Sequence, residues 1–399
     1  MSRLPARLQP LWPLVKRGHR VGARVIGSAG RRTVGPARGL PRTATTTSRE
    51  TERLEPASVR IHSLSPAQVL HRPMPPGDPA DADFLRRHTE ARIPERAVLD
   101  LAGGALLGRH AAVVTAGGIL DLETSHYFGI SGWKEHPVFW NPWPAAEQRV
   151  DGTVAVLAAR GTGGNYYHFV TDALPRIGML REALPDVEPD VWVLDRGARY
   201  QRELLALLGV EPERVVEPGP GLHLRARRLL VPSLPNAEML APPQSQEWLA
   251  ARLPPSPAAS DLPERIYVTR GTTPNTRRLV SEDATWERLE RRGFARVDPG
   301  TLSVQEQIDT FAAARVVVAP HGAALTNLVF CRPGVRLLEL FAPGYAVHCY
   351  WTITANIPGS RYRYLVARTP ERTGDNELMQ DIELGPDEIE AAVDELLAS

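Results

Sequence analysis

The chain has 399 residues, 43 % of them hydrophobic, so it can bury a large core and is long enough for two domains. Residues 1–49 hold eleven Lys or Arg and no acidic residue, which leaves 36 basic against 46 acidic residues in the remainder. The net charge of +1 therefore combines a basic tail with an acidic body, and we expect no nucleic-acid partner. The two cysteines, Cys331 and Cys349, exclude a disulfide framework and a C-x-x-C zinc site.

Residues 1–55 are predicted to form a disordered basic tail, because prolines and charges interrupt the apolar runs there. The same composition suits an anionic membrane surface, so a peripheral membrane contact is the alternative. No run approaches the roughly 18 to 20 apolar residues of a membrane-spanning helix, and residues 11–15 are too short for a signal peptide. We therefore expect a cytoplasmic protein, with the tail able to reach the inner face of the membrane.

A proline-rich lead-in with little periodicity is expected over residues 56–95. Short strands are predicted at residues 97–101, 111–115 and 119–122. From residue 154 strands alternate with helices, which indicates a parallel sheet covered by helices. The predicted strands are 154–159, 191–194 and 229–231, and the predicted helices are 166–184 and 200–208. Residues 254–261 are rich in proline and are predicted to be a linker.

The second half repeats the alternation. Strands are predicted at 265–269, 295–297, 316–319 and 336–340, and helices at 283–292, 303–313, 323–330 and 386–397. Ser303 and Glu306 have the spacing of a capping box at a helix start. The predicted fold class is α/β with two Rossmann-like lobes facing a cleft. The expected units are the tail 1–55, an N-terminal lobe 56–255, a C-terminal lobe 261–375, and a strand and helix in 376–399.

The segment from Val316 to Asn327 reads as a buried strand that runs through a small-residue turn into a helix. Small residues at Gly322 and Ala323 would let a phosphate approach the free N–H groups of the helix start. His321 could donate a further hydrogen bond. The alternative is an ordinary turn with a packed histidine.

Basic residues follow the predicted strand 265–269. Arg270 ends the strand, and Arg277 and Arg278 lie in the next loop, so they are expected at the ligand-facing edge of the sheet, where guanidinium groups match phosphate oxygens. Glu339, near the end of strand 336–340, suits two vicinal ribose hydroxyls. The alternative for each is an exposed surface charge.

Three polar residues are spaced i, i+3 and i+7 after a glycine turn: Asn165, His168 and Asp172. One helical face would present them together, although Pro175 limits this face to the first turns. Either His168 oriented by Asp172, or Asp172 itself, could act as a general base. The alternative is a polar stripe without a catalytic role.

Two stretches resemble glycosyltransferase family 61, a group that includes bacterial capsular-polysaccharide enzymes. They are Asn165-Tyr-Tyr-His-Phe-Val-Thr-Asp-Ala-Leu-Pro-Arg176, and the spaced pattern from Gly293 through Pro320-His-Gly-Ala323 to Glu339. Ser281 stands where the family pattern has Asn. A bacterial source is also suggested by the near replacement of lysine by arginine.

The resemblance implies a GT-B fold and an inverting transfer from a nucleotide-diphosphate sugar to a glycan or lipid-linked saccharide. It implies no metal and no other cofactor. It implies donor-binding roles for Arg270, Arg278, His321, Gly322, Ala323, Asn327 and Glu339. Catalytic roles fall on Asp172 and His168, and acceptor or positioning roles on Asn165 and Glu282.

Two other classes of protein have to be weighed: a catalytically silent saccharide-binding subunit of a polysaccharide assembly complex, and a polysaccharide pyruvyltransferase with a phosphoenol donor. Gly161-Thr-Gly-Gly imitates a dinucleotide fingerprint, but Tyr166 occupies the position of its third glycine. Asp81-Ala-Asp83 imitates a metal motif without a preceding strand, and we interpret it as chance.

Overall fold

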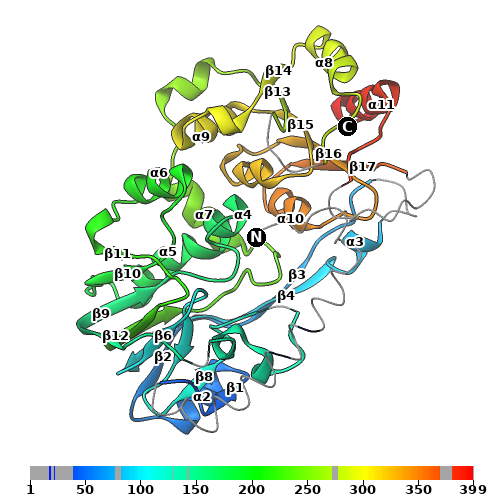
Figure 1. Cartoon of the computed structure of the whole chain (residues 1–399). Helices are drawn as coiled ribbons and strands as arrows, with labels where there is room; N and C mark the ends of the chain where they lie inside the picture. Colours follow the sequence, from blue (N-terminus) through cyan, green and yellow to red (C-terminus); the bar gives the residue numbers. More distant parts are fainter. Residues whose placement is uncertain are drawn as a thin grey trace.

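The computed structural model describes residues 39–76, 82–127, 129–141, 143–271, 277–368 and 380–398, together with the single residues 18 and 22. Most strands belong to two sheets, one built from residues 43–232 and the other from residues 265–366. Figure 1 shows them as the lower, blue-to-green part and the upper, yellow-to-red part of the molecule. The predicted α/β class is confirmed.

Secondary structure begins earlier than predicted. Strand β1 (Thr43–Thr45) and helix α2 (Ser48–Leu54) lie inside the stretch expected to be a disordered tail. The buried carboxylate of Asp121 holds this segment, because it accepts hydrogen bonds from the hydroxyls of Ser48 (3.1 Å) and Thr51 (2.6 Å). Elements held by polar contacts of this kind show no periodic pattern of apolar residues in the sequence. The predicted tail end at residue 55 is therefore wrong, and the rest of the tail lies almost wholly outside the described residues.

The lead-in over residues 56–95 is structured as well. It contains β2 (Val59–Ser65), β3 (Gln68–His71), α3 (Asp83–Arg86) and β4 (Glu90–Ile93). Strands β3 and β4 pair antiparallel and run from the first sheet to α3 (Figure 1). There Phe84 packs edge-on against Phe341 and Tyr364 of the second sheet, with ring centroids 5.2 and 5.3 Å away. The expectation of a structureless lead-in is wrong, because this segment ties the two sheets together.

The first sheet has ten strands and mixes both directions. Its remaining strands are β5 (Arg96–Ala102), β6 (Ala105–Leu107), β7 (Ala112–Val114), β8 (Ile119–Asp121), β9 (Gln148–Val156), β10 (Val191–Val193), β11 (Val215–Val216) and β12 (His223–Pro232). Strands β12, β9, β10 and β11 are parallel in that order, whereas β5 and β6 pair antiparallel with β12. The tight turns between β6, β7 and β8 explain the antiparallel part, because parallel neighbours need long crossovers. The predicted parallel sheet thus describes one half of the first sheet.

A π-helical turn interrupts the helix predicted over residues 166–184. The structure divides it into α4 (Tyr166–His168), the π-turn η6 (Phe169–Ala173) and α5 (Pro175–Ala183). The Leu174 N–H donates to the Phe169 carbonyl five residues back, at 3.2 Å. Because Pro175 has no N–H to donate, the wide turn falls where the regular ladder would break. Helices α6 (Arg199–Leu207) and α7 (Pro243–Arg252) follow.

The second sheet is parallel throughout. Its strands are β13 (Arg265–Val268), β14 (Ala295–Val297), β15 (Val316–Pro320), β16 (Arg336–Phe341) and β17 (Arg361–Val366), in the order β14-β13-β15-β16-β17. Its helices are α8 (Glu282–Arg291), α9 (Val304–Ala313), η10 (Ala323–Phe330), α10 (Cys349–Ala355) and α11 (Pro386–Ala398). This is the doubly wound order 2-1-3-4-5, which reverses between β13 and β15. Ligands bind such sheets at the carboxyl ends of the strands beside the reversal, where Arg270 and His321 lie.

Three further predictions for the second half concern the capping box, the helix after Gly322 and the C-terminal strand. The capping box is confirmed, since the Ser303 side chain accepts from the Glu306 N–H and the Glu306 side chain accepts from Ser303. Helix η10 is a tighter 3₁₀ helix than the α-helix expected there. The C-terminal strand expected after residue 376 is reduced to a single bridge between Leu279 and Ile382.

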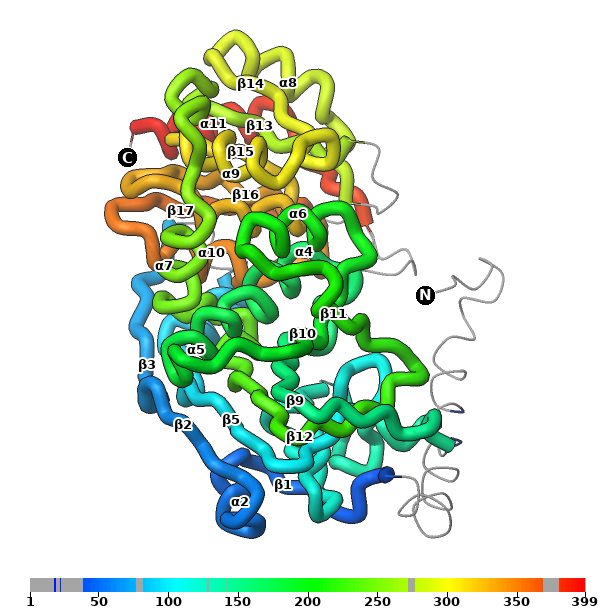
Figure 2. Tube along the Cα trace, turned by 90° about the vertical axis from the view of Figure 1, so that its left-hand side faces the viewer, coloured from blue at the N-terminus to red at the C-terminus, as the bar shows by residue number. Residues whose placement is uncertain are grey.

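One apolar cluster joins the two sheets. It contains Ala155 and Trp192 of the first sheet together with Ile266 and Val317 of the second. Helix α7 packs between α5 and η10, and Figure 2 shows it at the level between the sheets. The predicted linker is fixed too, because Ser256 donates to the Asp309 carboxylate through its N–H and its hydroxyl, both at 2.6 Å.

Candidate active site

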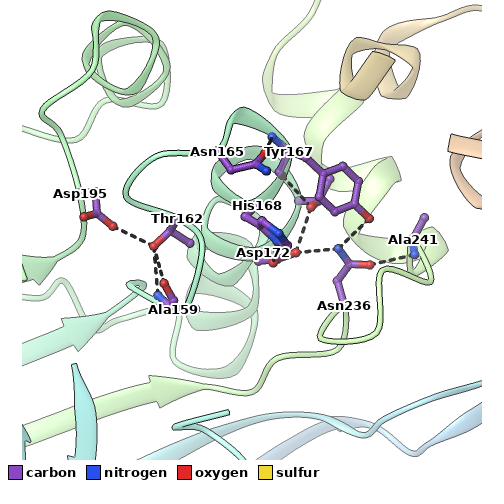
Figure 3. A network of polar contacts seen from close by, with 10 residues as sticks. Ala159, Thr162, Asn165, Tyr167, His168, Asp172, Asp195, Asn236 and Ala241 are labelled. Atoms are coloured by element: carbon purple, nitrogen blue, oxygen red, sulfur yellow. Dashed lines mark hydrogen bonds and ion pairs between the residues drawn. The ribbon is translucent and has the colours of Figure 1, made fainter. Parts of the chain in front are cut away.

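His168, at the end of α4, and Asp172, in the π-turn η6, form a hydrogen-bonded pair (Figure 3). The His168 Nδ1 lies 2.7 Å from the Asp172 Oδ2, and the side chains are 20 % and 10 % exposed. Gly161 lies against the imidazole with φ +97°, and a Cβ built there would stand 2.6 Å from the His168 Cδ2. Glycine is thus required at this turn both by the backbone and by the ring.

Asn165 has a different place from the one predicted. It is the N-cap of α4, where its Oδ1 accepts from the Tyr167 N–H at 2.9 Å. The three-residue helical face is therefore reduced to the pair of His168 and Asp172. The exposed Asn165 amide lies at the start of the same turn.

Asp172 is held by two further side chains, which leave its carboxylate well occupied. The Asn236 Nδ2 donates to the Asp172 Oδ1 at 2.6 Å, and the Thr171 hydroxyl donates to the same oxygen at 2.9 Å. The Asn236 Oδ1 accepts from the Ala241 N–H at 2.9 Å, which fixes the orientation of the amide (Figure 3). Asp172 is thus arranged to hold the Nδ1 proton of His168, and the opposite nitrogen, Nε2, has no hydrogen-bond partner among the described residues.

Arg176, at the end of the same motif, is a structural residue. Only 1 % of it is exposed, and its Nε and Nη2 donate to the Pro232 carbonyl at 3.0 and 2.7 Å. Burial lowers the pKa of this guanidinium to about 9, while the charge of Asp172 acts in the opposite direction. The contact ties the motif to the end of β12.

A second polar group lies at the end of β15. The His321 Nδ1 lies 2.5 Å from the Oε1 of Glu339, whose other oxygen accepts from the Tyr362 hydroxyl at 2.8 Å. The His321 ring stacks on Phe341 with centroids 5.1 Å apart. Glu339 is fully buried, so the expected contact with ribose hydroxyls does not fit its position. Its carboxylate instead fixes the orientation of His321.

Arg270 packs directly on the glycine that follows His321. Its Nη1 donates to the His321 carbonyl at 2.8 Å, and a Cβ at Gly322 would stand 2.3 Å from that nitrogen. Burial and the neighbouring charge of Arg277 lower the pKa of Arg270. The buried Nε atoms of Arg270 and Arg277 have no hydrogen-bond partner among the described residues, and the Arg277 guanidinium lies 4.6 Å from the centre of the Tyr345 ring. Two neighbouring cations with unsatisfied donors make this place a candidate anion site.

Asn327 is a buried link and not an exposed donor ligand. Its Oδ1 accepts from the Tyr166 hydroxyl at 2.8 Å, and its Nδ2 donates to Gln307 and to the Ala324 carbonyl, both at 3.0 Å. Every polar atom of this amide is therefore used within the protein. Tyr166 precedes the pair of His168 and Asp172 in the chain, so the contact connects the two motif segments.

Glu282 also serves the fold. Its Oε1 accepts from the hydroxyls of Tyr267 (3.1 Å) and Thr269 (2.5 Å), and Arg296 lies 3.2 Å away. The carboxylate thereby holds the end of β13 against α8.

Ala323 begins η10 beside the anion site and is partly exposed, as the phosphate interpretation needs. The exposed Arg278 adds its charge to the surroundings of Arg270. The backbone N–H of Arg278 donates to Asp381 at 2.9 Å.

Aromatic rings lie between the pair of His168 and Asp172 and the pair of His321 and Glu339. Tyr350 lies between them, with its ring centroid 5.9 Å from that of Tyr167 and 5.1 Å from that of His321. Both sequence motifs thus meet at one place in the fold, although 153 residues separate His168 from His321.

The second sheet thus has a candidate anion site at its reversal, and a histidine–carboxylate pair lies on an adjoining element, which is an arrangement that a ligand-binding α/β protein can use. The family model described as Glycosyltransferase 61 matches residues 166–338. The match supports membership of glycosyltransferase family 61 and indicates that the protein is a glycosyltransferase. No curated protein matches the sequence.

Two further observations concern only the described part of the chain. It contains no helix that is long and apolar enough to cross a membrane. It contains no group of three or more His, Cys, Asp or Glu side chains placed to hold a metal ion. Asp81 of the Asp-x-Asp imitation lies outside the described residues.

Proposed function

We propose that the protein transfers a sugar from a nucleotide-diphosphate donor to a hydroxyl of a glycan or lipid-linked saccharide, with inversion at the anomeric carbon. The observation that carries this proposal is the meeting of an oriented histidine with an anion site of two arginines on adjoining elements. In a GT-B arrangement, donor and acceptor would approach from opposite sides of this meeting place.

The donor diphosphate would bind at the end of β13. Arg270 and Arg277 each carry an unsatisfied Nε–H there, and Gly322 leaves room for the Arg270 guanidinium. As the glycosidic bond breaks, the electron pair goes to the leaving diphosphate, whose charge the two guanidinium groups would stabilise. The partly exposed start of η10 at Ala323 would add backbone donors.

The acceptor hydroxyl would lose its proton to the His168 Nε2 as its oxygen attacks the anomeric carbon. Asp172 would keep the Nδ1 proton in place and stabilise the imidazolium that forms, as a carboxylate does behind a catalytic histidine. Both carboxylate oxygens of Asp172 already accept hydrogen bonds. This favours His168 over Asp172 as the base.

The cellular location and the pathway of the reaction are predicted only from composition and from the family resemblance. A bacterial capsular-polysaccharide pathway, a cytoplasmic location and a membrane contact of the basic tail stay predictions. The tail prediction depends mainly on residues outside the described ranges.

The experiment is a two-step screen of the purified protein. A thermal-shift screen with nucleotide sugars would identify the donor, and incubation of that donor with saccharide acceptors would then be followed by release of the nucleoside diphosphate. Binding without turnover by any acceptor would support the silent saccharide-binding subunit. Stabilisation by a phosphoenol compound alone would support a pyruvyltransferase.

A further inference from the structure

A cavity of about 250 Å³ lies beside the first sheet and is not used by the site described above. Apolar side chains such as Leu107 and Leu222 form its walls, and Trp140, 42 % exposed, stands among its lining residues. Arg109 and His110 supply polar groups to the same lining. A mostly apolar cavity with a few polar groups is the usual form of a small-ligand site, and this volume lies below the roughly 300 Å³ at which drug-sized pockets begin.

Arg109 and His110 line this cavity, and a further basic group, Arg160, lies close enough for its charge to act on His110. The Arg109 side chain is exposed and makes no ion pair or hydrogen bond with any described residue. The Arg160 guanidinium lies 4.1 Å from the centre of the Tyr127 ring, and the centres of the His110 and Tyr127 rings are 5.2 Å apart. Burial, followed by the charges of Arg160 and Arg109, lowers the pKa of His110. A positive field in a partly buried place favours an anionic ligand.

The carboxyl group of Asp195, which follows β10, lies within range of the Arg109 charge. Burial raises the pKa of Asp195, and the charge of Arg109 acts in the opposite direction. Its Oδ2 accepts from the Thr162 hydroxyl at 2.8 Å, and a Cβ at Gly163 would stand 2.7 Å from its Oδ1. Asp195 is thus held by the glycine turn and does not form an ion pair with Arg109.

The chain connects Arg160 directly with the turn that holds His168. Arg160 is bonded to Gly161, so their Cα atoms are about 3.8 Å apart. Gly161 in turn touches the His168 ring, as the 2.6 Å spacing of its added Cβ indicates. One short segment of chain therefore connects the surroundings of the cavity with the proposed base.

We propose that this cavity is an acceptor subsite for a sugar unit that carries a carboxylate or a phosphate. The anion would pair with Arg109, and the C–H face of the sugar would pack against Trp140, whose indole offers a large apolar surface. The inference rests on the proposed glycosyl transfer, because it names the acceptor of that reaction. The anion could be a uronic acid within a polysaccharide or a phosphate on a saccharide.

Binding measured without donor tests this proposal separately from transfer. The probes are a glucuronic acid-containing disaccharide, a glucose phosphate, and a neutral glucose disaccharide, each titrated against the full chain by calorimetry and tryptophan fluorescence. The chain has 8 tryptophans, so Trp140→Phe shows which part of the fluorescence change arises at the cavity. We expect at least one anionic probe to bind and its fluorescence change to be lost in Trp140→Phe.

Arg109→Ala is expected to lower the affinity for the anionic probe about 5- to 10-fold and the affinity for the neutral probe less than 2-fold. The effect is moderate because an exposed cation is partly screened. Arg291→Ala, an exposed arginine on α8, is the matched control and should change neither. The uronic acid and phosphate arms identify the source of the anion. Equal weakening of charged and neutral probes, or binding that Trp140→Phe and Arg109→Ala leave unchanged, would overturn the subsite. Intact binding in a protein that transfers no sugar would instead count against the proposed function.

Discussion

At the scale of single residues, the arrangement of hydrogen bonds distinguishes two carboxylates that look alike in the sequence. Asp172 supports His168, and Glu339 supports His321, each through the imidazole Nδ1. Asp172 remains 10 % exposed, whereas Glu339 is fully buried. The first pair is therefore accessible to a substrate, whereas Glu339 fixes His321, whose carbonyl accepts from Arg270.

His168→Ala removes the proposed base. We expect it to lower kcat by about 10² to 10⁴, the usual size of a general-base contribution, with donor affinity nearly unchanged. Asp172→Asn keeps the shape and removes the charge behind the imidazole, so its effect on kcat should be no larger. Steady-state kinetics of both variants with one donor and acceptor checks this. A more damaging Asp172→Asn would make the aspartate the base.

Arg270→Ala should weaken donor binding, because one charge-assisted hydrogen bond to a phosphate is lost. The expected loss is about 1.5 to 3 kcal/mol, or roughly 10- to 150-fold in Kd. Gly322→Ala should act in the same direction, since its Cβ would stand 2.3 Å from the Arg270 Nη1. Gly385→Ala is the matched control, because no atom lies within 4 Å of its added Cβ. Titration of the nucleoside diphosphate measures all three, and unchanged affinity in Arg270→Ala would remove this residue from the donor site.

At the scale of elements, hydrophobic patterns predicted what is regular and missed what polar contacts stabilise. The strands at 265–269, 316–319 and 336–340 are confirmed within a residue or two, because buried parallel strands are continuous apolar runs. Strand β1 and helix α2 were missed, since hydroxyls bonded to Asp121 hold them. The hydrophobic periodicity of a sequence does not show such contacts.

The candidate site shows the same limit. Its histidines, Asp172 and Arg270 were predicted from turns that follow strands. Asn236 was missed, because it comes from a loop 64 residues beyond Asp172 and has no motif around it. Asn327 was predicted as a donor ligand, yet its bonds to Tyr166 and Gln307 depend on how two distant segments pack.

The glycine turn before α4 offers a test at this scale. Gly161→Ala places a Cβ 2.6 Å from the His168 Cδ2 at a φ of +97°, so the imidazole has to move. We expect kcat to fall about 10²-fold, the consequence of misplacing a base by about 1 Å, with donor Kd unchanged. Gly164→Ala in the same turn has space for its Cβ and should be close to wild type. Equal activity of the two variants would contradict a role for this turn in placing His168.

At the scale of the whole molecule, one apolar cluster and the bridge through Phe84 hold the two sheets together. Helix α4, which ends at His168, packs on η10, which begins after Gly322 at the edge of the second sheet where Arg270 lies. Fixed cations cost little reorganisation when charge develops on a leaving group. We propose that Arg270 and Arg277 supply the positive charge that a divalent metal provides in other sugar transfers.

Transfer is accordingly expected to survive chelation. Activity in excess EDTA should stay within about 2-fold of the untreated protein, because Arg270 and Arg277 would neutralise the diphosphate where a metal would otherwise act. The measurement is nucleoside diphosphate release with EDTA, with and without added manganese or magnesium. Arg270→Ala provides the internal comparison: if the arginines replace a metal, manganese should restore part of the lost activity in this variant and little in the wild type. Loss of wild-type activity in EDTA and its return with manganese would instead show that the anion site works together with a bound metal.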